Sequence, residues 1–161
     1  IPLYYNHLNT GRPLKEGTWF SKLKSNYLDI DNDPLYPFGY GLSYTTFKYG
    51  KPTLSSNTMT NNETISVSVD ITNTGNYDAD EIAQMYIRDL AASVSRPVKE
   101  LKGFERISIK KGETKTVTFT ITPEDLKFYN QELEYKNEPG EFEVMVGPNS
   151  KDVQTLTFTL K

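Results

Sequence analysis

Acidic side chains are the first candidates for chemistry in this chain of 161 residues. Two carboxyl groups held about 5 to 5.5 Å apart can act as nucleophile and acid/base in the hydrolysis of a glycoside with retention. Glu132 and Glu134 are two residues apart, so on an extended strand they would share one face. A flat, wet strand face neither shifts a carboxyl pKa nor encloses a sugar, so we interpret this pair as solvated surface. Glu16 is the single glutamate between residues 1 and 45, and its neighbour Gly17 indicates a loop.

A second acidic group has the alternating oxygens of a calcium-binding loop. Asp29, Asp31 and Asp33 follow that spacing, but an EF-hand needs Gly and Glu where this chain has Pro34 and Tyr40. The pattern therefore excludes an EF-hand and leaves two interpretations open, a looser calcium site or an acidic turn that stays wet. The same two interpretations apply to Asp78, Asp80 and Glu81.

Nucleophilic and zinc chemistry have little support. The chain has no cysteine, which excludes disulfides, thiol catalysis and thiolate zinc ligands. His7 is the only histidine, and one imidazole cannot supply the usual zinc ligand set, so we expect a hydrogen-bonded packing residue. Ser43 is followed by Tyr44, not by the glycine of a nucleophile elbow. We therefore expect no catalytic, cofactor-binding or metal-binding residue in this chain.

Composition limits the possible partners. With 36% hydrophobic residues, the chain can build one domain of ordinary size plus an extension. A net charge of -3 from scattered acidic and basic residues predicts no nucleic-acid partner and is compatible with a neutral sugar. No apolar stretch approaches the ~20 residues that span a bilayer. Because the chain starts with Ile1 and Pro2, we expect a piece of a longer polypeptide whose targeting segment, if any, lies upstream.

Residues 34–45, here called the linker, are too irregular for a helix or an alternating strand. Pro34 and Pro37 fix φ, whereas Gly39 and Gly41 permit turns that a residue with a Cβ resists. The first 50 residues hold 11 of the 20 aromatic residues without any sustained period. Such a segment cannot form a core alone, and we expect it to lie against another surface.

From about Tyr49 onward the pattern changes to period two, which is typical of strands with one buried face. We predict a seven-stranded antiparallel sandwich with strands near 46–54, 63–73, 81–89, 100–109, 113–121, 132–135 with 141–147, and 153–160. One helical turn is possible at Pro123–Leu126. The residues predicted to face inward are Ile65, Val67, Val69, Ile71, Val117, Phe119, Ile121, Phe142, Val144, Val146 and Phe158.

Several phrases of the sequence resemble one family. The linker, which reads PLYPFGYGLSYT, resembles the junction between the second domain of family 3 glycoside hydrolases and their C-terminal fibronectin type III-like domain. The phrases NTG at 73–75, QMYIRD at 84–89, RPVKELKGF at 96–104 and EPGEFEV at 138–144 occur in the order expected of that domain. The resemblance implies an all-β, immunoglobulin-like or fibronectin III-like sandwich at 46–161. Residues 1–45 would be the tail of the α/β sandwich domain and the linker.

The resemblance also implies what the chain does. It predicts a non-catalytic packing module of a retaining β-glucosidase-like enzyme, without cofactor, whose catalytic Asp precedes a Trp in an upstream domain. That motif is absent here, since the only Trp, Trp19, follows Thr18. The expected partners are the upstream domains, a second copy for the fragment alone, and a neutral glucoside for the parent, without a membrane span. A periplasmic or secreted bacterial location is implied by the family.

Seven residues are candidates for contacts beyond the sandwich. Interdomain packing is expected of Tyr36, Phe38, Tyr40 and Tyr44, because buried aromatics supply most area at such interfaces. Contact with the rim of a substrate cleft is a weaker hypothesis for Arg12, Trp19 and Arg96. Arg12 could instead brace a loop, and Trp19 could lie at an interface or form a sugar platform.

Two other functions remain open on the sequence. A carbohydrate-binding module would need an exposed, coplanar aromatic row, which is not obvious from Tyr77, Tyr86, Tyr129 and Tyr135. A cell-surface adhesion or spacer module is suggested by the phrase NTG alone, but such a module has no use for the linker.

Overall fold

The structure is a computed structural model that describes residues 3–10, 27 and 29–161. In those residues the main strands are β4 (Ile65–Asn73), β5 (Ala79–Asp89), β6 (Glu100–Ile109), β7 (Thr114–Ile121), β10 (Gly140–Gly147) and β11 (Gln154–Leu160). The shorter strands are β1 (Phe47–Tyr49), β2 (Thr53–Leu54), β3 (Thr58–Met59), β8 (Phe128–Tyr129) and β9 (Tyr135–Lys136). Among the described residues, no helix is long and apolar enough to cross a membrane.

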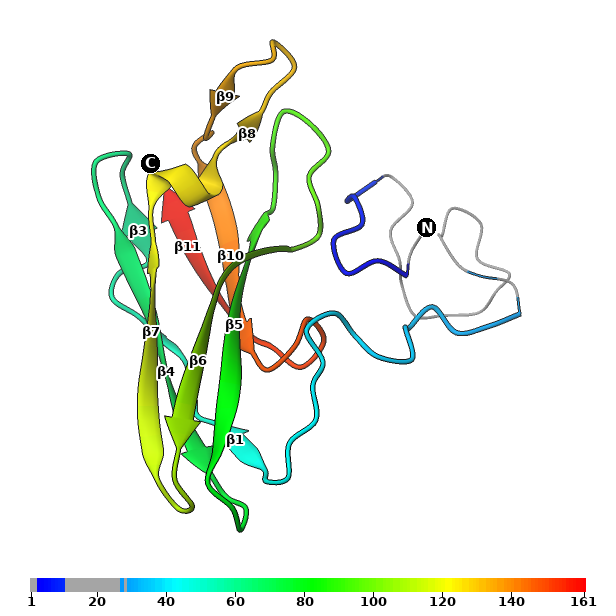
Figure 1. Ribbon diagram of the computed structural model, residues 1–161. Coiled ribbons are helices and arrows are strands. Elements are labelled where there is room, and N and C mark those ends of the chain that lie inside the picture. The colour runs from blue at the N-terminus through cyan, green and yellow to red at the C-terminus, as the bar shows by residue number, and fades with distance from the viewer. Residues whose placement is uncertain (1–2, 11–26, 28) are drawn as a thin grey trace.

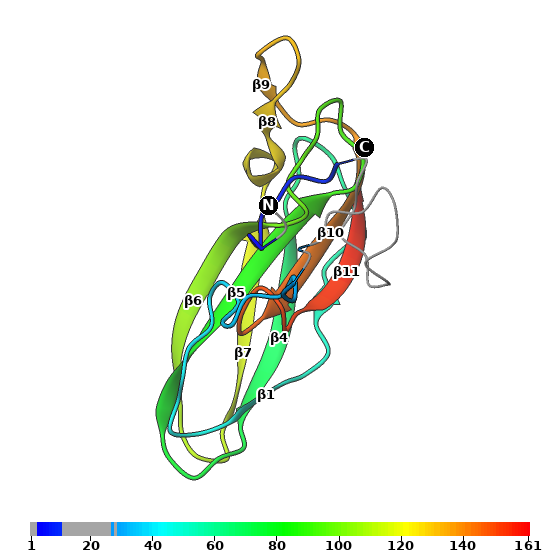
Figure 2. The ribbon, with the colours of Figure 1, turned by 90° about the vertical axis from the view of Figure 1, so that its right-hand side faces the viewer.

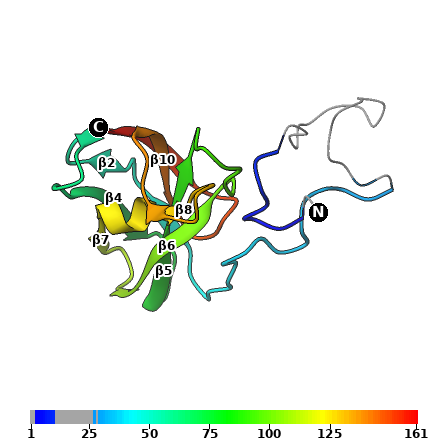
Figure 3. The ribbon, with the colours of Figure 1, turned by 90° about the horizontal axis from the view of Figure 1, so that it is seen from above.

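The main strands form two sheets that pack face to face, as the view from above shows (Figure 3). In one sheet β4 pairs with β1, β2 and β7. The other has the order β3-β11-β10-β5-β6. The predicted all-β sandwich is therefore confirmed.

The core lies between the sheets and is built from alternate residues. All eleven residues that the sequence predicts to face inward are buried, with Phe119 the most exposed of them at 8%. The rings of Phe142 on β10 and Phe158 on β11 stack at 5.5 Å across the registered pair. Since a slip of one residue would turn a whole row outward, this burial confirms the predicted registers.

The sequence prediction is wrong in three places. The predicted strand 46–54 is divided into β1 and β2 around Gly50 and Pro52, and both parts pair with β4. β3 is an additional strand that runs parallel to β11, so the pairing is not wholly antiparallel. Residues 132–135 do not extend β10, because β9 pairs instead with β8 in a separate hairpin.

The predicted turn at Pro123–Leu126 exists as one short 3-10 helix, η1. Pro123 occupies its first turn, where a missing N–H is tolerated, and Thr122 and Asp125 form a capping box. Thr122 donates to the Asp125 carboxylate from its backbone N–H at 2.8 Å and from its hydroxyl at 2.7 Å. The turn leads directly into the β8–β9 hairpin, which projects from one end of the sandwich (Figure 1).

Candidate docking face

The side of the five-stranded sheet that faces away from the core, here called the outer face, carries buried side chains. Strand alternation places Ala83, Met85 and Ile87 in the core, so Tyr86 points the other way. Tyr86 is nevertheless 0% exposed, and Met145 on β10, which pairs with it across the sheet, is 4% exposed. The outer face must therefore be covered by another part of the chain.

The cover comes from the N-terminal segment, residues 3–10, and from the linker. The Tyr5 ring stacks on the Phe38 ring at 4.1 Å with 12° between their planes. Tyr5 also meets the Tyr86 ring edge-on at 5.9 Å. Two segments that are distant in sequence thus close over one aromatic residue of β5, and the linker crosses in front of β5 and β10 in Figure 2.

Backbone and side-chain hydrogen bonds fix the linker to the sheet. The Gln84 side-chain nitrogen donates to the carbonyl oxygens of Gly39 at 3.0 Å and Pro148 at 2.6 Å. The Tyr86 hydroxyl donates to the Gln84 side-chain oxygen at 2.5 Å. Burial raises the pKa of the Tyr86 phenol, as does the nearby Tyr5, so Tyr86 remains a donor. Because both polar ends of Gln84 are satisfied, the network can be buried at low cost.

Gly39 is suited to this contact by its backbone. Its φ of +80° is in the left-handed region that glycine tolerates best. A Cβ built on Gly39 would lie 2.0 Å from the Gln84 side-chain oxygen. The residue that follows, Tyr40, closes a turn by donating its N–H to the Pro37 carbonyl at 3.0 Å. The loop after β10 adds a further bond, from the Ser150 N–H to the Phe38 carbonyl at 2.9 Å.

The N-terminal segment has its own attachment to the loop between β5 and β6. Val98 donates its N–H to the His7 carbonyl at 2.9 Å, and the Asn9 N–H donates to the Arg96 carbonyl at 2.8 Å. Leu8 and Pro97 form an antiparallel bridge between these bonds. His7 is half-buried and joins this pairing through its backbone.

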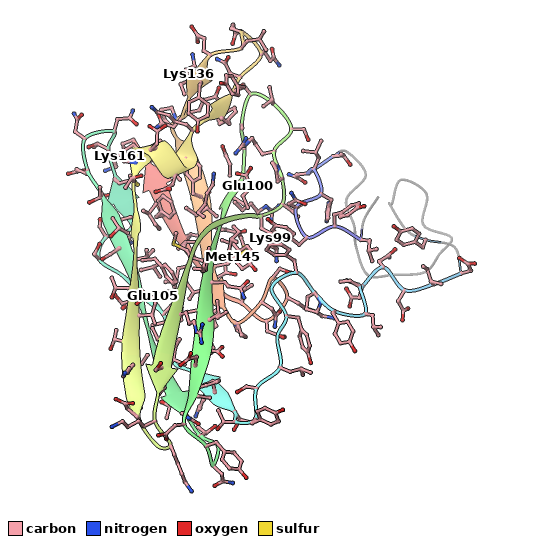
Figure 4. The ribbon with its side chains drawn as sticks, viewed as in Figure 1. Lys99, Glu100, Glu105, Lys136, Met145 and Lys161 are labelled. Carbon is pink, nitrogen blue, oxygen red and sulfur yellow. The ribbon has the colours of Figure 1, made fainter. Side chains whose placement is uncertain are left out.

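Charged groups border the covered area. The Lys99 ammonium donates to the Ser150 carbonyl at 2.7 Å, and burial lowers its pKa, with a further decrease from Arg88. Lys99, Glu100 and Met145 lie on the side of the sandwich nearest the N-terminal segment (Figure 4). Lys151 pairs with Asp33 at 2.6 Å. A groove of about 530 Å³ runs between the N-terminal segment, the linker and Lys99.

The four predicted packing aromatics remain partly or largely exposed in this chain. Tyr44 is 97% exposed, Tyr36 64%, Phe38 45% and Tyr40 44%. Tyr36 and Tyr40 contact each other at 5.2 Å between ring centroids. Next to them the outer face itself exposes Phe104, which is registered with Gln84. The linker and the outer face therefore both expose aromatic side chains.

Of the predicted rim residues, the structure describes Arg96 alone. Arg12 and Trp19, like Glu16, lie outside the residues that the structure describes. The Arg96 guanidinium lies 4.5 Å from the Phe128 ring centroid and bonds the Glu100 carboxylate at 2.8 Å. Arg96 therefore joins the loop between β5 and β6 to the β8–β9 hairpin.

Several of the acidic candidates are engaged in local contacts. Glu132 and Glu134 do not share a strand face, because both lie in the connection between β8 and β9, and Glu134 pairs with Lys136 at 2.7 Å. Asp80 bonds Arg106 and Ser108, and Glu81 accepts the Tyr49 hydroxyl at 2.8 Å. Within the described part of the chain, no cluster of three or more His, Asp or Glu residues could hold a metal ion.

The outer face together with the N-terminal segment and the linker that cover it is here called the docking face. Sequence reasoning missed Tyr5, Gln84 and Tyr86 as members of this face. The available signal was Tyr86 itself, an aromatic residue on the face of β5 opposite Met85 and Ile87. Of the groove-lining residues that the structure describes, only Asp33 carries a carboxyl group, and it is paired. The contacts of this face hold segments together, and the described lining of the groove contains no pair of carboxyl groups for acid/base chemistry.

Comparisons with known proteins agree with this picture. Residues 81–150 match the family described as the fibronectin type III-like domain. The chain is 52% identical over 160 residues to a periplasmic β-glucosidase of Salmonella typhimurium, covering 99% of this chain and 21% of that protein. A β-xylosidase of Formosa agariphila is 51% identical over 140 residues, covering 86% of this chain and 19% of the relative.

A solved structure gives the same result. The β-glucosidase of Listeria innocua, crystallised with isofagomine, superimposes with a TM-score of 0.91 at 45% identity. The match covers 99% of this chain and 22% of that protein. The chain therefore spans about a fifth of the length of the relatives that it matches.

Proposed function

We propose that the chain is the C-terminal packing module of a family 3 glycoside hydrolase. Through residues 81–150 it belongs to the fibronectin type III-like domain family, and it is homologous to the C-terminal 20% of family 3 β-glucosidases and β-xylosidases. In this role it is non-catalytic and joins to upstream domains that hydrolyse terminal β-glucosides with retention. We keep the division into residues 1–45, the tail of the preceding domain with the linker, and 46–161, the sandwich.

One observation carries this proposal. The linker is fixed to the outer face through Gln84 and Ser150, yet Tyr36, Tyr40 and Tyr44 remain exposed. Tyr36 and Tyr40 contact each other, and exposed apolar patches are typical of interaction sites. The linker is hydrogen-bonded to the sheet and exposes tyrosines to solvent, so a partner domain could pack against these tyrosines.

We assign the hydrolysis catalysed by the parent enzyme to the domains upstream of this chain. A retaining glycosidase needs two carboxyl groups about 5 to 5.5 Å apart in a site that holds a sugar. The groove offers a paired Asp33 and no second carboxyl group among its described lining residues. The periplasmic location of the Salmonella relative supports a periplasmic or secreted parent.

An activity assay tests the catalytic part of this proposal. The purified 161-residue chain should release no aryl alcohol from an aryl β-glucoside above a buffer blank, whereas a longer polypeptide with the upstream domains should. Turnover by the chain alone that is lost in Glu16→Gln would place catalysis in this chain and contradict the proposal.

A further inference from the structure

The β8–β9 hairpin with its flanks, residues 127–138, carries an aromatic pair that the docking face does not use. Tyr129 and Tyr135 are directly opposite each other on the two strands. Their ring centroids are 5.0 Å apart with 43° between the planes. Tyr129 is 65% exposed and Tyr135 48%. The hairpin projects away from the sandwich, so the pair is presented to solvent (Figure 1).

The hairpin is held rigidly at its base and at its tip. Its base is fixed by the Arg96 guanidinium over Phe128 and by Glu138, which accepts from the Ser93 N–H at 2.9 Å. At the tip, the Asn130 side-chain oxygen accepts the N–H groups of Glu132 at 3.0 Å and Glu134 at 2.9 Å. These contacts fix the arrangement of the two rings, so less side-chain conformational entropy is lost when a ligand binds.

The local charges point to a neutral ligand. The two lysines beside the rings are both paired, Lys127 with Glu124 at 2.7 Å and Lys136 with Glu134 at 2.7 Å. No free cation of the hairpin thus remains for a phosphate or carboxylate ligand. Neither tyrosine hydroxyl has a hydrogen-bond partner among the described residues, so both can bond the hydroxyl groups of a ligand.

The size of the pair argues against a second protein as its occupant. Even fully buried tyrosines supply about 150 to 250 Å² each. A standard protein interface needs about 800 Å² per partner, so two rings fall well short of a stable dimer. A pyranose ring needs only one aromatic face, on which its apolar C–H groups stack.

We propose that Tyr129 and Tyr135 form a binding site for a short, soluble, neutral β-linked gluco-oligosaccharide. The 43° between the ring planes forms a bent surface, which fits a flexible chain and does not fit a flat crystalline one. Lys127 lies 5.8 Å from the Tyr135 ring centroid and restricts one side of that ring. Tyr129 therefore contributes more of the stacking surface. The choice of sugar rests on the proposed function, but the site itself does not.

Titration of the isotope-labelled 161-residue chain with cellohexaose and laminarihexaose, followed by amide NMR, tests this site. We expect saturable shifts confined to residues 127–138 for at least one sugar. Tyr129→Ala should weaken affinity about three- to tenfold, and Tyr135→Ala less, as expected for the loss of one aromatic contact. Tyr77→Ala is the matched control, because Tyr77 is 64% exposed in the turn between β4 and β5, and it should bind like the unaltered chain.

Two results would contradict the sugar site, and a third would assign the tyrosine pair to another partner. No saturable shift with either sugar, or equal affinity in the Tyr129→Ala and Tyr77→Ala variants, would overturn the site. Self-association that Tyr129→Ala abolishes, without sugar binding, would assign the pair to a second copy. Melting curves of each variant establish that the sandwich is intact. None of these measurements involves the upstream domains, so their failure leaves the packing role untouched.

Discussion

Gly39 is the single residue on which attachment of the linker most depends. It combines a left-handed φ of +80° with a position where a Cβ would meet Gln84 at 2.0 Å. Two other glycines separate these effects. Gly112 has a φ of +76° and open space around it, whereas Gly41 has neither a positive φ nor an atom within 4 Å of its Cβ position.

Alanine substitution should destabilise the chain most at Gly39, less at Gly112 and least at Gly41. Gly39→Ala should release the linker, since strain of about 1 to 3 kcal/mol at a left-handed residue is added to a steric clash. Gly112→Ala should lower stability through strain alone, and Gly41→Ala should have almost no effect. Hydrogen exchange at the Ser150 amide, which donates to Phe38, reports linker release directly. Protection of Ser150 that survives Gly39→Ala would contradict this account of the linker.

Asp89 is a buried carboxylate that the docking face does not need. One of its oxygens accepts the Ala91 N–H at 3.1 Å, and the other has no partner within the described structure. Burial raises the pKa of Asp89, although the Ala91 N–H and Arg96 oppose that rise. The folded state therefore binds this proton more tightly than the unfolded state, and ionised Asp89 reduces stability as the pH rises through its folded pKa.

Asp89→Asn should accordingly stabilise the chain at neutral pH, because it removes an incompletely paired buried charge. The advantage should shrink as the pH falls below the raised pKa and the native carboxyl group becomes neutral. Urea unfolding at several values between about pH 4 and pH 7, a range that begins near ordinary carboxyl pKa values, measures the difference in unfolding free energy between the two proteins. Asp70→Asn, at an exposed position, controls for the loss of one negative charge. An advantage that grows on acidification would have the wrong sign.

At the scale of elements, the linker acts as part of the fold rather than as a tether. Phe38 stacks on Tyr5, and Tyr40 contacts Tyr36. Leu35 and Leu42 lie in the same segment but are each 88% exposed. Phe38 and Tyr40 are therefore linker residues with ring contacts, whereas Leu35 and Leu42 are linker residues left in solvent.

Replacing Phe38 and Tyr40 together by Ser should lower the free energy of unfolding by about 1 to 3 kcal/mol, with the sandwich still folded. The melting temperature should fall by about 2 to 4 °C per kcal/mol for a chain of this size. Replacing Leu35 and Leu42 by Ser is the control and should leave melting nearly unchanged. Equal melting curves for the two double variants, with unchanged light scattering, would remove the packing role and restore Trp19 as a candidate sugar platform.

The elements that could be predicted from sequence are those whose burial is a local pattern. β4, β7 and β11 alternate between more and less buried residues, because each has one face in the core and one nearer to solvent. The short strands β1, β2 and β3 depend on partners far along the chain, so alternation over two or three residues could not locate them. The β8–β9 hairpin was missed because its strands have two residues each, too few to show a period, and Asn130 shapes its turn.

The candidate site shows the same limit. The aromatic composition of the linker indicated a packing role, but composition does not reveal which face of which sheet receives Phe38. Tyr86 reads as an outward residue of β5, and only the return of Tyr5 and Phe38 across the sheet buries it. The contacts of the Arg96 guanidinium with Phe128 and Glu100 could not be read from the sequence, and the contact of Arg96 with a substrate rim stays a prediction.

At the scale of the whole molecule, the sandwich separates two surfaces. The docking face lies on the outer side of the five-stranded sheet, and the Tyr129–Tyr135 pair lies on the hairpin at one end (Figures 1 and 2). Packing against an upstream domain and binding of a sugar can therefore be tested separately.

Side-chain footprinting by hydroxyl radicals tests the packing role most directly. Labelling of Tyr36, Tyr40 and Tyr44 is compared between the 161-residue chain and the longer polypeptide that includes the upstream domains, with Tyr77 as the internal reference. We predict that the three linker tyrosines are labelled readily in the chain alone and protected in the longer polypeptide, while Tyr77 is labelled equally in both. Equal labelling of all four tyrosines in the two proteins would contradict the proposal that this chain is a packing module.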